Sequence, residues 1–231
     1  MSSQPTQCPE VTEAVRGLLR SGDVEQAVHL VLEVYRPALL AYLGASEFAS
    51  FFRTNGSVSE EDAVQGFLAE KVTRDGFLEQ WTSKPNRLRA FLLTAFRYYL
   101  LGLRRKELLR AAAPIDVFEE ESSRDLEPNA SRQFDRRLAG EIVLKAFEAT
   151  RRRAMQDGKG HYVDLFRRVC LDGCSHAEAK AEREDVTGDM KSIVKTVRLW
   201  LAQAIALQIA HPGAPEHEIK EAISTLMESL R

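Results

Sequence analysis

Residues that interrupt helices or cross-link small folds are scarce in this sequence. Its 231 residues include 13 glycines, 8 prolines and 3 cysteines. The few glycines and prolines leave long segments in which apolar residues recur at helical spacing, and the alternation typical of β-strands is absent. Three cysteines, an odd number, fit no disulfide framework and favour a reducing compartment. The sequence therefore predicts an all-α fold.

Long hydrophobic runs are also missing. The longest, such as WLAQAIALQIA at 200–210, are too short and too interrupted to cross a bilayer. The opening residues, MSSQPTQCPE, lack the basic flank and apolar run of a targeting segment. We therefore expect a cytoplasmic protein that does not associate with membranes.

Apolar spacing indicates where the helices lie. The length of the chain suits two small domains, each with its own core. We expect helices at 10–20, 23–44, 46–54, 59–72, 74–81, 85–110, 131–156, 160–171, 175–184, 187–210 and 215–230.

An acidic segment divides these helices into two blocks. Residues 111–131, AAAPIDVFEEESSRDLEPNAS, hold two prolines and six acids against one arginine, and show no sustained helical period. We expect a linker there, between a helical bundle at 23–110 and a second helical domain at 132–210. Residues 1–22 form an N-terminal flank, and 211–231 an additional amphipathic helix after a Pro/Gly break.

Positive charge is concentrated in one part of an acidic chain. The net charge is −2, which argues against a protein that coats nucleic acid through bulk positive charge. Residues 84–110 nevertheless contain eight Lys or Arg and one acid, Glu107, so that this segment carries +7 and the rest of the chain −9. Such segregation directs a polyanion to one surface, although a solvated, arginine-rich helix face has the same composition.

The same segment interleaves aromatic rings with this charge. Phe96, Tyr98 and Tyr99 flank Arg97, and a cluster of basic residues follows two turns later: Arg104, Arg105, Lys106 and Arg110. Bases stack on aromatic rings while Arg and Lys bind phosphates, so the pattern favours an unpaired nucleic-acid strand. The alternative is that both tyrosines cap the core with their hydroxyls in water.

Two further patterns lie on either side. Ser59 and Asp62 have the spacing of a capping box, which leaves Asp62 and Gln65 on the outer side of a helix, as a docking surface or as solvated residues. The helices at 175–184 and 187–210, joined at Gly188, have the arrangement of a helix-turn-helix. Helix pairs of this kind also pack cores without reading DNA.

Taken in order, these patterns resemble the extracytoplasmic-function (ECF) group of the bacterial RNA polymerase sigma-factor family, part of the sigma-70 family. AVHLVLEVYRPALLAYL resembles its opening helix, EEDAVQGFLAEKV its polymerase-binding helix, and RLRAFLLTAFRYYLLGLRRKE its promoter-opening helix. FRRVCLDGCSHAEAKAERE with GDMKSIVKTVRLWL resembles the domain that reads the minus-thirty-five element. The resemblance implies a transcription initiation factor without catalytic activity or cofactor.

The resemblance also assigns roles to residues. It implies that Asp62 and Gln65 contact core RNA polymerase. It places Arg97, Tyr98 and Tyr99 near the melted non-template strand at the minus-ten element of promoter DNA, with Arg104, Arg105 and Lys106 on its phosphates. In the second domain it assigns upstream duplex DNA to Ser175, Lys191, Ser192, Lys195 and Arg198.

The chain departs from the family pattern at identifiable positions. Gly66 stands where an acid is common, and Tyr98 and Gly102 replace a familiar asparagine and acid. The helix-turn-helix is the most divergent part. A sigma-like module that binds polymerase or another partner without directing initiation is therefore the alternative, and a regulator such as an anti-sigma factor is a further expected partner.

We also weighed a metal site. Cys170, Cys174 and His176 form a C-x3-C-x-H pattern that supplies three zinc ligands only if the turn folds back. Without a fourth ligand nearby, we favour buried thiols and expect no metal.

Overall fold

The computed structural model describes residues 11–54, 58–83, 87–110, 127–181, 189–209 and 215–230. Within these ranges the regular structure is helical and no strand occurs, so the prediction of an all-α fold is confirmed. No helix in this part of the chain combines the length and apolar character that crossing a membrane requires.

The chain divides into two compact units. Unit 1 comprises Met1–Glu141 with Ser224–Arg231, and unit 2 comprises Ile142–Ile223. The division differs from the boundary at 132 expected from the sequence, because a single helix, α7 (Pro128–Gln156), contributes its first half to unit 1. The end of the expected linker, residues 128–131, is the first turn of this helix, and 111–126 lie outside the described residues.

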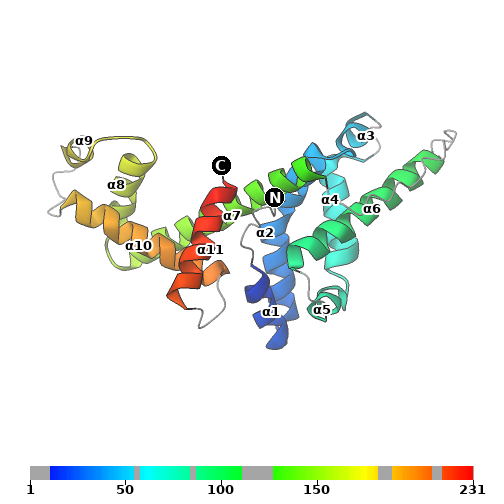
Figure 1. Ribbon diagram of the computed structural model, residues 1–231, viewed down its shortest axis with the longest axis horizontal. Coiled ribbons are helices and arrows are strands. Elements are labelled where there is room, and N and C mark those ends of the chain that lie inside the picture. The colour runs from blue at the N-terminus through cyan, green and yellow to red at the C-terminus, as the bar shows by residue number, and fades with distance from the viewer. Residues whose placement is uncertain are drawn as a thin grey trace, which may run out of the picture. The chain divides into compact units, whose positions relative to one another are not determined.

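Unit 1 is built around α2 (Val24–Ala45). Asp23 caps its first turn by accepting a hydrogen bond from the backbone N–H of Gln26, at 3.2 Å. Apolar residues at helical spacing then bury one side of α2 completely: Ala27, Val31, Val34, Tyr35, Ala38, Leu39, Tyr42 and Leu43. Helices α1 (Thr12–Arg20) and α4 (Glu60–Phe67) pack against α2, and α3 (Ala49–Thr54) follows it (Figure 1).

The predicted N-terminal flank is in part a component of this core. Val11, directly before α1, and Val15 within it are buried. The Arg16 guanidinium lies 4.8 Å from the centre of the Trp81 ring in α5 (Phe77–Thr82). A cation above an aromatic face is attracted by the ring's negative charge density. Helix α1 therefore closes one side of the bundle.

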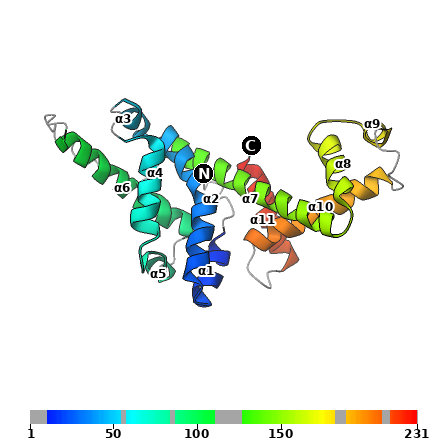
Figure 2. The ribbon, with the colours of Figure 1, turned by 180° about the vertical axis from the view of Figure 1, so that it is seen from behind.

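Helix α6 (Leu88–Arg110) carries the basic and aromatic segment. Its buried residues are Leu88, Phe91, Leu92, Leu93, Phe96, Leu100 and Glu107. Phe96 lies 6.2 Å from the Tyr42 ring and 5.0 Å from the Phe67 ring, between ring centres, so α6 is held between α2 and α4. In Figures 1 and 2 the C-terminal half of α6 extends past α4, and most of its residues there are at least partly exposed.

The first half of α7 docks on this bundle through one aromatic and two polar contacts. The Phe134 ring is fully buried against Tyr35, with 6.1 Å between ring centres. Arg89 of α6 forms a bidentate ion pair with Asp135, and its guanidinium also lies over the Phe134 ring. The Glu127 carboxylate accepts a hydrogen bond from the Glu47 backbone N–H at 3.0 Å.

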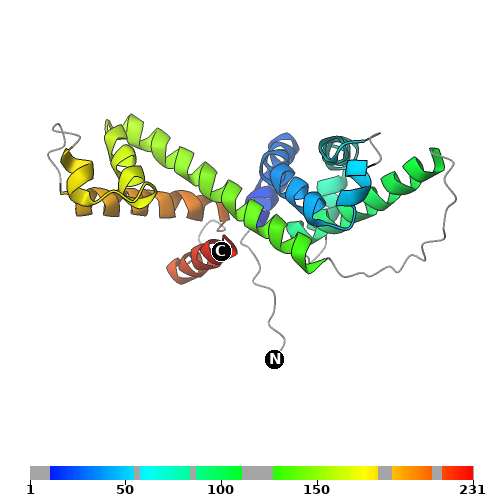
Figure 3. The same ribbon diagram turned by 90° about the horizontal axis from the view of Figure 1, so that it is seen from above.

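Unit 2 packs the second half of α7 with α8 (Gly160–Cys170), α9 (His176–Ala181) and α10 (Met190–Ile209) (Figure 2). Trp200 and Val197 lie in one apolar cluster with Ala154, Val163, Phe166 and Val194. Helix α10 runs antiparallel to this part of α7 (Figure 3), and side-chain hydrogen bonds join Arg153 to Gln203 and Gln208 to the Ile142 carbonyl. Helix α11 (Glu216–Ser229) is the predicted C-terminal amphipathic helix, and it buries Leu226.

The docking of α7 on unit 1 predicts an asymmetric effect of two neighbouring substitutions. Replacing Phe134 with alanine removes a fully buried ring and should lower the free energy of unfolding of unit 1 by about 3–5 kcal/mol. Replacing exposed Gln133 should change it by less than about 0.5 kcal/mol. Urea unfolding in a Trp200→Phe background reports unit 1 alone, since Trp81 is then the single tryptophan. Equal midpoints for the two variants would show that α7 does not contribute to the core of unit 1.

Candidate nucleic-acid interface

Helix α6 presents its polar and aromatic residues on three separate sides. A helix turns about 100° per residue, so residues seven apart lie nearly above one another. Arg97 and Arg104 share one side, Tyr98 and Arg105 a second, and Tyr99 and Lys106 a third. The six α6 residues that the sequence grouped together therefore do not form a single surface.

The first side is used within the fold. Arg97, whose side chain is only 15% exposed, donates to the Glu47 carboxylate at 3.1 Å. The Arg104 guanidinium lies 5.7 Å from the centre of the Phe51 ring. Arg97 and Arg104 thus hold α6 against the segment around α3. Arg97 therefore does not share a surface with Tyr98, its exposed neighbour in the sequence.

The second side is open to solvent. Tyr98 is 63% exposed, more than most large hydrophobic residues in the described part of the chain. Gly102, also exposed, follows one turn later, and a side chain added there would meet no atom within 4 Å. Arg105 continues the row and is exposed. Along this side of α6, the Tyr98 ring and the Arg105 guanidinium are therefore separated by the bare backbone at Gly102.

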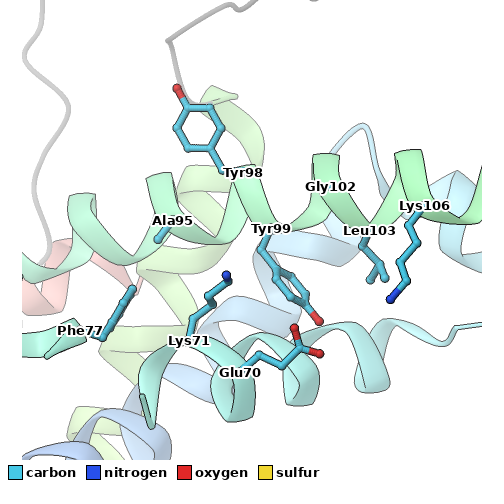
Figure 4. Close-up of a pocket in the computed structure, with 9 residues that line it drawn as sticks. All are labelled: Glu70, Lys71, Phe77, Ala95, Tyr98, Tyr99, Gly102, Leu103 and Lys106. Atoms are coloured by element: carbon cyan, nitrogen blue, oxygen red, sulfur yellow. The ribbon is translucent and has the colours of Figure 1, made fainter. Parts of the chain in front are cut away.

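The third side of α6 borders a trough. It has a volume of about 400 Å³ and is lined by Glu70, Lys71, Phe77, Ala95, Tyr98, Tyr99, Gly102, Leu103 and Lys106. Its opposite wall is η1 (Leu68–Val72), a single turn of π-helix that continues α4. Figure 4 shows Tyr98 pointing away from this wall, whereas Tyr99 points across the trough toward Glu70. Ala95, Tyr99 and Leu103 continue the apolar helical spacing of Phe91 and Phe96, but they are only partly buried and line this trough.

The position of Tyr99 depends on a glycine. Its ring packs on Phe67, with 5.7 Å between centres, and its hydroxyl lies 2.5 Å from where a Cβ on Gly66 would be. Any larger residue at position 66 would displace the hydroxyl. Burial, and to a lesser extent the nearby Glu70 carboxylate, raise the pKa of Tyr99, so the hydroxyl remains a proton donor at neutral pH. The departure from the family pattern at Gly66 therefore has a physical reason in this chain.

The trough continues past Phe77. A second hollow of about 270 Å³ is lined by Lys71, Arg74, Asp75, Phe77 and Gln80, and it shares Lys71 and Phe77 with the first. Sequence reasoning missed Glu70, Lys71 and Phe77, because they lie on the far side of the trough from α6. The one signal available was that Glu70 and Lys71 lie at the end of the predicted polymerase-binding helix and that Phe77 lies in the next predicted helix.

The predicted docking residues lie on α4. The capping box is confirmed: the Ser59 hydroxyl accepts from the Asp62 N–H at 3.0 Å, and the Asp62 carboxylate accepts from the Ser59 N–H at 3.3 Å. Asp62 thus stabilises the start of α4 and is at the same time exposed. Gln65, one turn later, is also exposed.

In unit 2, the predicted duplex-binding residues lie directly before α9 and along the first half of α10. Ser175 forms a capping box with Glu178, which lowers the pKa of the Glu178 carboxyl through hydrogen bonds from the Ser175 backbone and side chain. Lys191, Ser192, Lys195 and Arg198 are exposed on α10, and Arg198 also contacts the Cys170 sulfur at 3.8 Å. The turn between the two helices, including Gly188, lies outside the described residues.

No group of three metal-binding side chains occurs in the part of the chain that the structure describes, which includes Cys170, Cys174 and His176.

Comparisons of the whole chain with family models, with curated proteins and with solved structures find no match.

The contact between Tyr99 and Gly66 predicts a change of sign in a double-mutant cycle. In the wild type, Gly66→Ala forces the Tyr99 hydroxyl aside and should destabilise unit 1 by about 1–2 kcal/mol. In a Tyr99→Phe background the obstructing atom is absent, and the same substitution should stabilise unit 1 by up to about 1 kcal/mol, the helix preference of Ala over Gly. Chemical denaturation of the four proteins measures the cycle. The same sign in both backgrounds would mean that the hydroxyl does not occupy this space.

Proposed function

We propose that this chain is an ECF-type sigma factor, which binds core RNA polymerase in the cytoplasm and directs promoter recognition, DNA opening and transcription initiation. The observation that carries the proposal is the outer side of α6: exposed Tyr98 and Arg105, with Lys106 beside them at the edge of an aromatic-lined trough. This combination suits a single strand and not a duplex, because a ring can stack only on a base that has left its pair.

The dimensions of α6 agree with a short stretch of DNA. Tyr98 and Arg105 are seven residues apart, about 10 Å along a helix. This distance corresponds to roughly three stacked nucleotides of one strand. A strand following the helix axis would stack one base on Tyr98 and place phosphates at Arg105 and Lys106, while the next unpaired base has the trough within reach.

The charge distribution supports the same arrangement. The exposed part of α6 carries Arg105, Lys106 and Arg110, whereas the start of α4 carries Glu61 and Asp62 on its exposed side, with Glu61 paired to Arg36. Two surfaces of opposite charge in one bundle fit a protein that binds two different macromolecules, DNA through α6 and polymerase through α4. Promoter opening then needs no catalytic residue, because binding energy for the unpaired strand shifts the equilibrium toward melted DNA.

One observation favours the alternative of a sigma-like interaction module. Arg97 is paired with Glu47 and Tyr99 packs on Phe67, so two of the residues that the resemblance assigns to DNA hold the fold together. A bundle retained only for protein contacts would keep both interactions. The two functions differ in what the exposed side of α6 binds.

Transcription with purified core polymerase distinguishes the two functions. On a pool of genomic fragments, the wild type should give specific starts, and Arg105→Ala/Lys106→Ala should reduce them at least tenfold with polymerase affinity unchanged. A matched control, Arg20→Ala/Arg132→Ala, removes the same charge from exposed positions of unit 1 outside α6 and should preserve the starts. Stable polymerase binding without any specific start would instead establish the interaction module.

Salt dependence gives a second measure of the same contacts. The affinity for single-stranded DNA falls as the salt concentration rises. On logarithmic scales, each phosphate contact adds about 0.7 to the steepness of this fall. The Arg105→Ala/Lys106→Ala variant should therefore show a slope shallower by about 1.4 if both residues bind phosphates, whereas the Arg20→Ala/Arg132→Ala control should keep the wild-type slope. An unchanged slope in the first variant would remove Arg105 and Lys106 from the DNA-binding surface.

A further inference from the structure

One acidic side chain lies within the otherwise basic trough. Glu70, on η1, lines the same hollow as Lys71 and Lys106, and among the described residues it forms no ion pair. Its carboxylate faces the Tyr99 hydroxyl across the trough (Figure 4). A carboxylate without an ion-pair partner repels phosphates. At a surface that binds a DNA strand it therefore opposes binding, unless a base offsets the repulsion by donating hydrogen bonds to it.

A carboxylate accepts hydrogen bonds and donates none. On the pairing edge of an unpaired base, guanine offers two adjacent donors, the ring N1–H and the exocyclic amino group, which match the two carboxylate oxygens. Adenine and cytosine offer an amino group beside an acceptor nitrogen, which a carboxylate repels. Thymine has no amino group, and its single N–H lies between two carbonyl oxygens.

From this chemistry we propose that Glu70 selects the base that enters the trough, and that the base it selects is guanine. The proposal rests on the proposed function, because it requires a single strand to follow α6. Glu70 would accept hydrogen bonds from N1–H and the amino group of an unpaired guanine, and the Tyr99 hydroxyl would donate to the guanine O6.

Two features of the chain place these two groups, and a third serves the faces of the base. The π-helical turn brings Glu70 to the wall that faces α6, and turns of this kind are frequent at functional sites. Gly66 leaves the space in which the Tyr99 hydroxyl lies. Phe77 and Leu103 supply apolar surface for the faces of the base, and the volume of about 400 Å³ lies within the range of sites for small planar ligands.

The test uses the full chain and short oligothymidylates in which one central position is guanine, hypoxanthine or thymine. Hypoxanthine keeps O6 and N1–H but lacks the amino group. Fluorescence anisotropy at low salt should give the wild type a preference for guanine over thymine of about tenfold, with hypoxanthine between them. Glu70→Ala should abolish this preference and at the same time strengthen binding of the thymine oligonucleotide, since it removes a repulsive charge.

A variant that had lost its structure would bind every oligonucleotide more weakly. Glu70→Ala should instead lose the guanine preference and bind the thymine oligonucleotide more strongly. Glu79→Ala, an exposed acid on α5 that does not line the trough, is the matched control and should behave as the wild type. Binding that is equally strong for all three oligonucleotides would overturn base selection by Glu70 and leave the proposed function standing. Absence of binding to any of them would contradict both, because the exposed side of α6 would not then hold a single strand.

Discussion

The packing of Phe96 between Tyr42 and Phe67 is the contact on which the candidate interface depends. It fixes the rotation of α6 about its own axis. With Phe96 and Leu100 facing inward, helical geometry leaves Tyr98 and Arg105 toward solvent and turns Tyr99 and Lys106 toward η1. A rotation of about 200°, two residues, would bury Tyr98 in the place of Phe96 and expose Phe96. The core of unit 1 therefore decides which side chains a ligand can reach.

Around this contact, the same residues serve both the fold and the interface. Gly66 weakens α4 by about 1 kcal/mol of helix preference, yet it makes room for Tyr99. Arg97 is withdrawn from the surface to hold Glu47, whose backbone N–H is in turn bound by Glu127 at the start of α7. The Arg89–Asp135 ion pair adds a second polar contact there, and burial raises the pKa of Asp135 despite the guanidinium beside it. Such half-buried pairs specify geometry more than they add stability.

Local signals in the sequence predicted most of the helices, but not which residues of other helices they contact. The capping box of Ser59 and Asp62, and the apolar spacing of α6 and α10, were sufficient to place helices within a few residues. The position of the Tyr99 hydroxyl was not predictable, because it depends on Gly66 in another helix. The docking of Phe134 on Tyr35 was missed for a similar reason: a proline-containing acidic segment before a helix says nothing about which bundle that helix joins. Glu70 was overlooked because its neighbours in space come from α6.

The central claim is that the exposed side of α6 holds the unpaired non-template strand in a polymerase complex. Replacing Tyr98 by a photo-crosslinking phenylalanine derivative tests this most directly. The full chain is assembled with core polymerase and genomic fragments, irradiated, and the attached DNA is sequenced. The account predicts crosslinks to one strand only, the non-template strand, at a fixed short distance upstream of transcription starts. Crosslinks to polymerase subunits alone, or to both strands without preference, would contradict it.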